Sequence, residues 1–206
     1  MLDSEGTKLY DLIWVCIWRD RKTGRICRHY IHHIAQQNEI EHASLEYFAD
    51  ALLLHLEKDT GLFNGIQKVY FSGDHAKNFA NFVAHALTSI IRTRFGLEIV
   101  FEYLCSYHAY NECDGCGAIV CSCLDGEIAA GRHIIGVKDF KDLILSRPAQ
   151  FPNHDVYIIN FLSENYDKYL GALGIQTPKL NFPVQKYCEV IYIYIYICYI
   201  IYFIIM

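Results

Sequence analysis

One short segment concentrates side chains that could perform chemistry. Residues 108–123 read HAYNECDGCGAIVCSC and contain one histidine, four cysteines and two carboxylates, Glu112 and Asp114. Thiolate and imidazole groups are ligands for zinc, whereas carboxylate oxygens suit Mg²⁺ or Mn²⁺. The segment therefore raises two alternatives, a zinc site and a carboxylate site for hard divalent ions.

The zinc alternative depends on His108, Cys113 and Cys116. Two residues separate Cys113 from Cys116, a spacing that allows both thiolates to bind one ion. Cys121 and Cys123 do not repeat that spacing, and small buried apolar residues would explain them as well. Two further histidines, His32 and His33, lie on a predicted strand and point to opposite faces, so they are weaker candidates.

The carboxylate alternative depends on Asp74 and Asp114, with Glu112 as a substitute for Asp114. Asp74 ends a predicted strand, and Asp114 follows the next strand near the start of a helix. Because functional groups collect at the carboxyl ends of strands in open α/β sheets, we expect Asp74 and Asp114 to share an Mg²⁺ or Mn²⁺ site. The competing explanation is that each aspartate caps a helix.

The elements that must position these groups follow from hydrophobic periodicity. Runs rich in aromatic and β-branched residues predict strands at 10–20, 26–35, 66–74, 97–106 and 155–162. Apolar stripes with helical spacing predict helices at 42–59 and 76–96, another ending near residue 130, and one at 138–146. Alternation of strands and helices predicts an α/β domain.

The amino-acid composition argues against some functional classes and some cellular compartments. The chain has 206 residues, nine cysteines and a net charge of −5, which does not suggest a strongly basic nucleic-acid-binding surface. The amino-terminal residues lack the basic and apolar pattern of a signal peptide, and the cysteine count is odd. We therefore expect an intracellular protein with reduced thiols.

The carboxyl-terminal residues differ in kind from the rest. The segment 190–206, VIYIYIYICYIIYFIIM, is uncharged and consists almost entirely of isoleucine and tyrosine. Three hypotheses explain it: translation of a TATATA repeat, a tail anchor in a membrane, or a core strand. We accordingly divide the chain into a domain at 1–187 and an apolar low-complexity tail at 188–206.

Several segments together resemble the catalytic core of cut-and-paste DDE/D transposases of the broad group that includes hAT and Mutator-like elements. The matching pieces are EHASLEYFADALL, KVYFSGDHAKNF, YLCSYHAYNECDGCGAIV and GVKDF. The resemblance implies an RNase H-like mixed sheet flanked by helices, metal-dependent DNA cleavage and transfer with Mg²⁺ or Mn²⁺, DNA as partner, and the nucleus as location.

Within this resemblance, Asp74 matches the second catalytic acid, and Asp114 or Glu112 matches the third. His108 and Cys113 match the family's histidine and cysteine at the same turn. The strand carrying the first acid is expected before Met1, so we expect a truncated, catalytically inactive remnant. The alternative is a non-enzymatic interaction or zinc-binding domain, tethered to a membrane through its tail.

Overall fold

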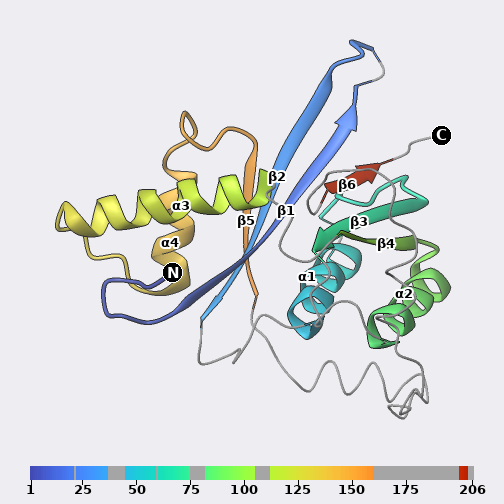
Figure 1. The fold of residues 1–206 in the computed structure, drawn as a ribbon, viewed down its shortest axis with the longest axis horizontal. Helices are drawn as coiled ribbons and strands as arrows, with labels where there is room; N and C mark the ends of the chain where they lie inside the picture. Colours follow the sequence, from blue (N-terminus) through green and yellow to red (C-terminus); the bar gives the residue numbers. More distant parts are fainter. Residues whose placement is uncertain are drawn as a thin grey trace. The chain divides into compact units, whose positions relative to one another are not determined.

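The computed structural model describes residues 1–20, 22–36, 45–58, 60–74, 82–104, 112–159 and 200–203 (Figure 1). The chain divides into two compact units. Unit 1 comprises Met1–Ala43 and Asn111–Phe161, and unit 2 comprises Ser44–Tyr110 and Leu162–Met206. Unit 1 is therefore built from two stretches of chain with part of unit 2 between them.

Unit 1 contains three strands in a mixed sheet. Strands β1 (Leu9–Arg19) and β2 (Ile26–Gln36) form a long antiparallel hairpin. At its turn, the Asp20 carboxylate accepts hydrogen bonds from the backbone N–H groups of Lys22 and Thr23. Strand β5 (His154–Ile158) pairs in parallel with β2, so β2 is the central strand of the three.

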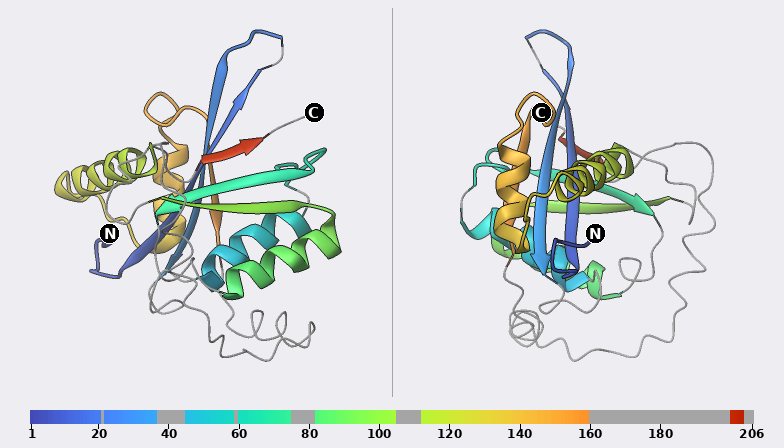
Figure 2. Two further views of the ribbon diagram at one scale, coloured as in Figure 1. Left: turned by 45° about the vertical axis from the view of Figure 1, so that its right-hand side comes forward. Right: turned by 90° about the vertical axis from the view of Figure 1, so that its left-hand side faces the viewer.

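Two helices, α3 (Glu112–Ala129) and α4 (Gly136–Leu145), lie on one face of these strands (Figure 1 and Figure 2). Their apolar side chains pack against the inward-facing side chains of the strands. The resulting core includes Val15, Ile34, Val120, Leu124, Phe140, Ile144 and Val156. Burial of this apolar surface is the main force that holds α3 and α4 on the sheet.

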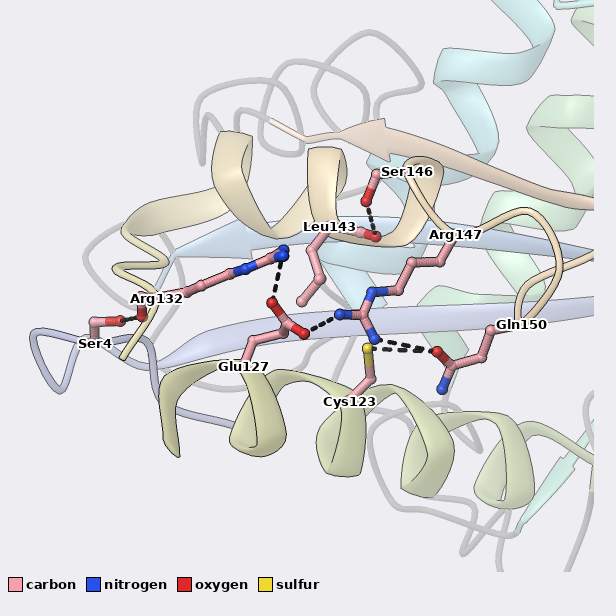
Figure 3. Close-up of polar contacts among 8 residues, drawn as sticks. All are labelled: Ser4, Cys123, Glu127, Arg132, Leu143, Ser146, Arg147 and Gln150. Carbon is pink, nitrogen blue, oxygen red and sulfur yellow. Dashed lines mark hydrogen bonds and ion pairs between the residues drawn. The ribbon is translucent and has the colours of Figure 1, made fainter. Parts of the chain in front are cut away.

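A polar network joins the end of α3 to the segment that follows α4. Figure 3 shows Glu127 of α3 between Arg132 and Arg147, with an ion pair to each. Arg147 and the thiol of Cys123 also donate to the Gln150 side-chain oxygen. The network fixes Gln150, which lies beside the pocket described below.

Unit 2 contains helix α1 (Leu45–Glu57), strand β3 (Lys68–Asp74), helix α2 (Phe82–Phe95) and strand β4 (Glu98–Leu104). Strands β3 and β4 are parallel and are connected through α2. Aromatic rings fill the core, with Phe48 of α1 against Phe71 and Phe101 of the strands. Within the tail, β6 (Ile200–Phe203) pairs antiparallel with β3.

The predicted elements agree with the structure. Each strand and helix predicted above has a counterpart within a few residues, and the mixed α/β class is confirmed. The RNase H-like arrangement stays a prediction. No helix within the described residues is both long enough and apolar enough to cross a bilayer. Residues 188–199 and 204–206 of the tail lie outside the described part of the chain.

Candidate metal centre

A cluster of His32, Cys116 and His154 lies between the sheet and helix α3 of unit 1. Strand register explains why the two histidines meet. His154 is the partner of Tyr30 in the parallel β2–β5 pair, and His32 lies two residues further along β2 on the same face. Helix α3 packs on this face and contributes Cys116, so side chains from three separate elements converge.

The distances within the cluster are short. His32 Nε2 lies 2.8 Å from His154 Nδ1 and 3.8 Å from Cys116 Sγ. One potential ligand atom from each residue lies within 4.8 Å of the other two. His32 is 0% exposed, Cys116 is 6% exposed, and His154 is partly buried. Cys116 is a free thiol. The three groups could hold one metal ion.

Asp11 supports the cluster from strand β1. It lies two residues from Ile13, which is the cross-strand partner of His32, so its side chain reaches His32 diagonally on the same face. Asp11 Oδ2 lies 2.8 Å from His32 Nδ1, and the side chain of Asp11 is 5% exposed. The other oxygen, Oδ1, is buried without a hydrogen-bond partner among the described residues. A buried carboxylate in this setting requires positive charge nearby.

The electrostatics of the metal-free cluster follow from this contact. Burial opposes a charge on His32, but the Asp11 carboxylate outweighs burial and raises the pKa of His32 to about 10. Burial, together with the charge on His32, lowers the pKa of His154 to about 4. At neutral pH, His32 therefore donates from Nδ1 to Asp11 and from Nε2 to the neutral His154. A metal ion at Nε2 would replace that proton and retain the positive charge beside Asp11.

Two of the three separations can be compared with those of a tetrahedral ion. Typical Zn–N and Zn–S bond lengths place two nitrogen ligands about 3.3 Å apart, and a nitrogen and a sulfur ligand about 3.6 Å apart. The observed separation between Nε2 and Sγ is 3.8 Å, close to that value. The two histidine nitrogens, 2.8 Å apart, would have to separate by roughly 0.5 Å to admit the ion. Changes in side-chain torsion angles can supply a shift of this size.

A pocket of about 370 Å³ lies against the cluster. Cys116 and His154 belong to both the cluster and the pocket wall. The remaining wall is mostly apolar and is formed by Tyr30, Glu112, Gly115, Ile119, Gln150, Phe151 and Pro152. The pocket therefore gives access to two of the three candidate ligands.

The predicted zinc ligands only partly coincide with this cluster. Cys116 belongs to it, but Cys113 turns to strand β1, where its thiol lies 3.5 Å from the backbone oxygen of Ile13. His108 lies outside the described residues. The C-x₂-C spacing thus identified one cysteine of the cluster, whose other members are histidines from strands far away in sequence.

The predicted carboxylates occupy different surroundings. Glu112 begins α3 at the pocket wall, and both of its oxygens accept hydrogen bonds from Arg28 Nε, at 2.9 and 3.0 Å. Asp114 is exposed in the first turn of α3, where negative charge stabilises a helix terminus. Strand β3 ends at Asp74, whose side chain lies outside the described part of the structure. Asp74 and Asp114 belong to different units, so a shared ion stays a prediction.

Comparison of the chain with protein-family models, curated proteins and solved structures finds no match. The chemical interpretation of the cluster therefore depends on its own geometry. Sequence reasoning missed His154, considered Asp11 only as a substitute for the first catalytic acid, and gave His32 little weight. The available signal was the presence of two ionisable residues, Asp11 and His32, in strands that the sequence predicts to pair as one hairpin.

Proposed function

We propose that unit 1 is a zinc-binding domain in which His32, Cys116 and His154 are the protein ligands. The observation that carries this proposal is the convergence of their ligand atoms to within 4.8 Å of one another. Two imidazoles and a thiolate are ligands that suit zinc, whereas Mg²⁺ and Ca²⁺ prefer oxygen ligands. Of the divalent ions considered for this chain, zinc fits the donor set best.

Asp11 completes the site without touching the ion. A histidine that binds metal through one nitrogen usually donates its other N–H to a carboxylate, which fixes the ring orientation and strengthens the ligand. The 2.8 Å contact between His32 Nδ1 and Asp11 Oδ2 has this form. Asp11 is therefore a positioning residue of the site.

Zinc here would connect β2, β5 and α3 at the centre of unit 1. Such a link adds the free energy of metal binding to the stability of the folded state, because the unfolded chain does not present the three ligands together. The expected role is a metal-stabilised interaction or scaffold domain.

Metal titration of the full chain tests the proposal. After treatment with a chelator, we expect the protein to bind one equivalent of Zn²⁺ in competition with a chromophoric indicator. Co²⁺ in its place should produce a thiolate-to-metal charge-transfer band. Cys116→Ser should abolish this band.

The matched control is Cys123→Ser. Cys123 lies on the same helix and is 7% exposed, but its thiol contacts Gln150 and does not belong to the cluster. This variant should keep the band. Retention of the band in Cys116→Ser, or the absence of any stoichiometric binding by the unsubstituted chain, would refute the zinc site.

A second candidate is a transposase-derived domain whose ancestral chemistry was metal-dependent DNA strand cleavage and transfer. The parallel β3–α2–β4 unit, with Asp74 at the carboxyl end of β3, supports it. Since we identify only two acids of the expected three, this chain should not nick supercoiled plasmid DNA with Mg²⁺ or Mn²⁺. Nicking that disappears in Asp74→Asn would instead show a complete catalytic set.

A further inference from the structure

We infer that a metal ion held by His32, Cys116 and His154 keeps one open coordination position facing the pocket, and that this position takes an uncharged aromatic molecule with a single nitrogen donor. The inference rests on the proposed zinc site and names the class of its external ligand. The observation that supports it is that two members of the cluster also form part of the pocket wall.

The open position follows from the number of protein ligands. Among the described residues, only these three present histidine, cysteine or carboxylate groups close enough together to share an ion. Asp11 is committed to His32 Nδ1, and Glu112 is held at the pocket wall by both hydrogen bonds from Arg28. A tetrahedral ion with three protein ligands retains a fourth position for water or another small ligand.

The direction of that position follows from burial. His32 is fully buried and lies against Asp11. Cys116 and His154, by contrast, form part of the pocket wall. An ion bound to all three residues is therefore reached through the pocket. A volume of about 370 Å³ is sufficient for a small ring system.

Charge favours a neutral ligand. A divalent ion, the Cys116 thiolate and the Asp11 carboxylate have no net charge when taken together. Glu112 is the charged residue of the pocket wall, and Arg28 pairs with it. A charged ligand would lose its hydration in a mostly apolar pocket without gaining an opposite charge.

The shape and chemistry of the wall favour an aromatic ring. Tyr30 stacks on His154 with ring centroids 4.5 Å apart and an angle of 12° between the rings. Phe151 meets His154 edge to face, with centroids 5.3 Å apart. A flat ligand bound to the ion would lie among these rings and gain the stacking energy of offset or edge-to-face pairs.

Visible spectroscopy of the Co²⁺-loaded full chain tests the inference, with benzimidazole as the probe. A nitrogen donor entering the open position should shift the d–d bands of the ion in a saturable manner. Indole has a similar shape but lacks the free nitrogen lone pair, so it should leave the bands unchanged. Equal shifts with both molecules, or no shift with benzimidazole, would overturn the inference.

A pair of glycine substitutions on α3 locates the binding place. Gly115 belongs to the pocket wall, and a Cβ there would meet no atom within 4 Å. Gly115→Phe should therefore fill the pocket without straining the helix and weaken benzimidazole binding by about tenfold or more. Gly126→Phe is the control, because Gly126 is equally unobstructed and lies outside the pocket wall.

The two proposals fail in different ways. Without a zinc site, the charge-transfer band is absent before any probe is added. With a zinc site but no accessible position, the band is present and benzimidazole has no effect. If Gly115→Phe binds benzimidazole as tightly as the unsubstituted protein, the probe binds outside the pocket and the inference is wrong.

Discussion

Substitution of Asp11 tests how much negative charge beside His32 contributes to metal binding, because it removes none of the three proposed ligands. Asp11→Asn preserves the size of the side chain but removes the negative charge beside His32. We expect Zn²⁺ affinity to fall by about 10- to 100-fold, which is the usual effect of losing such a partner of a metal-binding histidine. Competition with a chelator of known affinity measures the change.

Asp155→Asn is the matched control for that experiment. Asp155 also pairs with a histidine, His29, at 2.9 Å, but the pair lies at the surface and outside the cluster. Its substitution should change Zn²⁺ affinity much less than Asp11→Asn does, because the Asp155 carboxylate is not a member of the cluster and acts on His154 through its charge. Equal losses in both variants would mean that general charge, rather than the Asp11–His32 contact, governs binding.

Cys113 distinguishes the structural cluster from the sequence-based zinc hypothesis. Its thiol lies against the Ile13 backbone oxygen and is not one of the three candidate ligand groups of the cluster. We expect Cys113→Ser to keep one equivalent of Co²⁺ and the charge-transfer band. Loss of the band in this variant would restore the Cys113–Cys116 pair as the metal ligands.

Asp3 links the amino terminus to the start of α4 and makes stability depend on pH. Burial favours its neutral form, but the N–H groups of Gly136, Thr7 and Glu5 donate to the carboxylate and hold the pKa of Asp3 below its usual value. Its contribution is therefore present above the unfolded-state pKa and is lost as the pH falls through the folded-state pKa.

Asp3→Asn should accordingly lower the free energy of unfolding at pH 7 by about 1–2 kcal/mol, because hydrogen bonds to a charged acceptor are lost. The difference from the unsubstituted protein should shrink toward pH 3. Urea unfolding at several pH values measures this dependence. A difference that does not change with pH would show that the charge of Asp3 is not involved.

At the scale of elements, the apolar face of α4 should contribute strongly to the folding stability of unit 1. Phe140 is fully buried against the strands, whereas Leu145 at the end of the same helix is 46% exposed. Phe140→Ala should destabilise unit 1 by about 3–5 kcal/mol, and Leu145→Ala by much less. Both tryptophans, Trp14 and Trp18, lie on β1. Tryptophan fluorescence during urea unfolding therefore reports on unit 1, and equal effects would contradict the packing described.

The elements themselves were predictable because their signals are local. The run of aromatic and β-branched residues from Tyr10 to Arg19 and the helical spacing of apolar residues around Leu52 are visible in short windows of sequence. The partners of those elements were not predictable in the same way. The parallel pairing of β2 with β5, which brings His154 to His32, joins residues 122 positions apart. No local spacing records such a contact, so sequence reasoning favoured nearby Cys113 as the partner of Cys116.

At the scale of the whole molecule, the tail is expected to be dispensable for folding. Its described part, β6, pairs with β3 through Val69 and Tyr70, and β3 also has a parallel partner in β4. A chain ending at Tyr187 should therefore unfold cooperatively and aggregate less, because a long uncharged segment with high strand propensity is removed. Calorimetry and light scattering measure both properties. Loss of the unfolding transition would show that the tail belongs to the core.

The division of unit 1 into two stretches of chain sets the order of events during synthesis. The β1–β2 hairpin leaves the ribosome first, whereas His154 follows His32 by 122 residues. At typical elongation rates this interval is roughly 6 to 24 seconds. Until this interval ends, the nascent hairpin has its carboxylate–histidine pair but not the complete set of proposed metal ligands. Metal capture by the proposed site would then be a late step, possible only after translation has passed through β5.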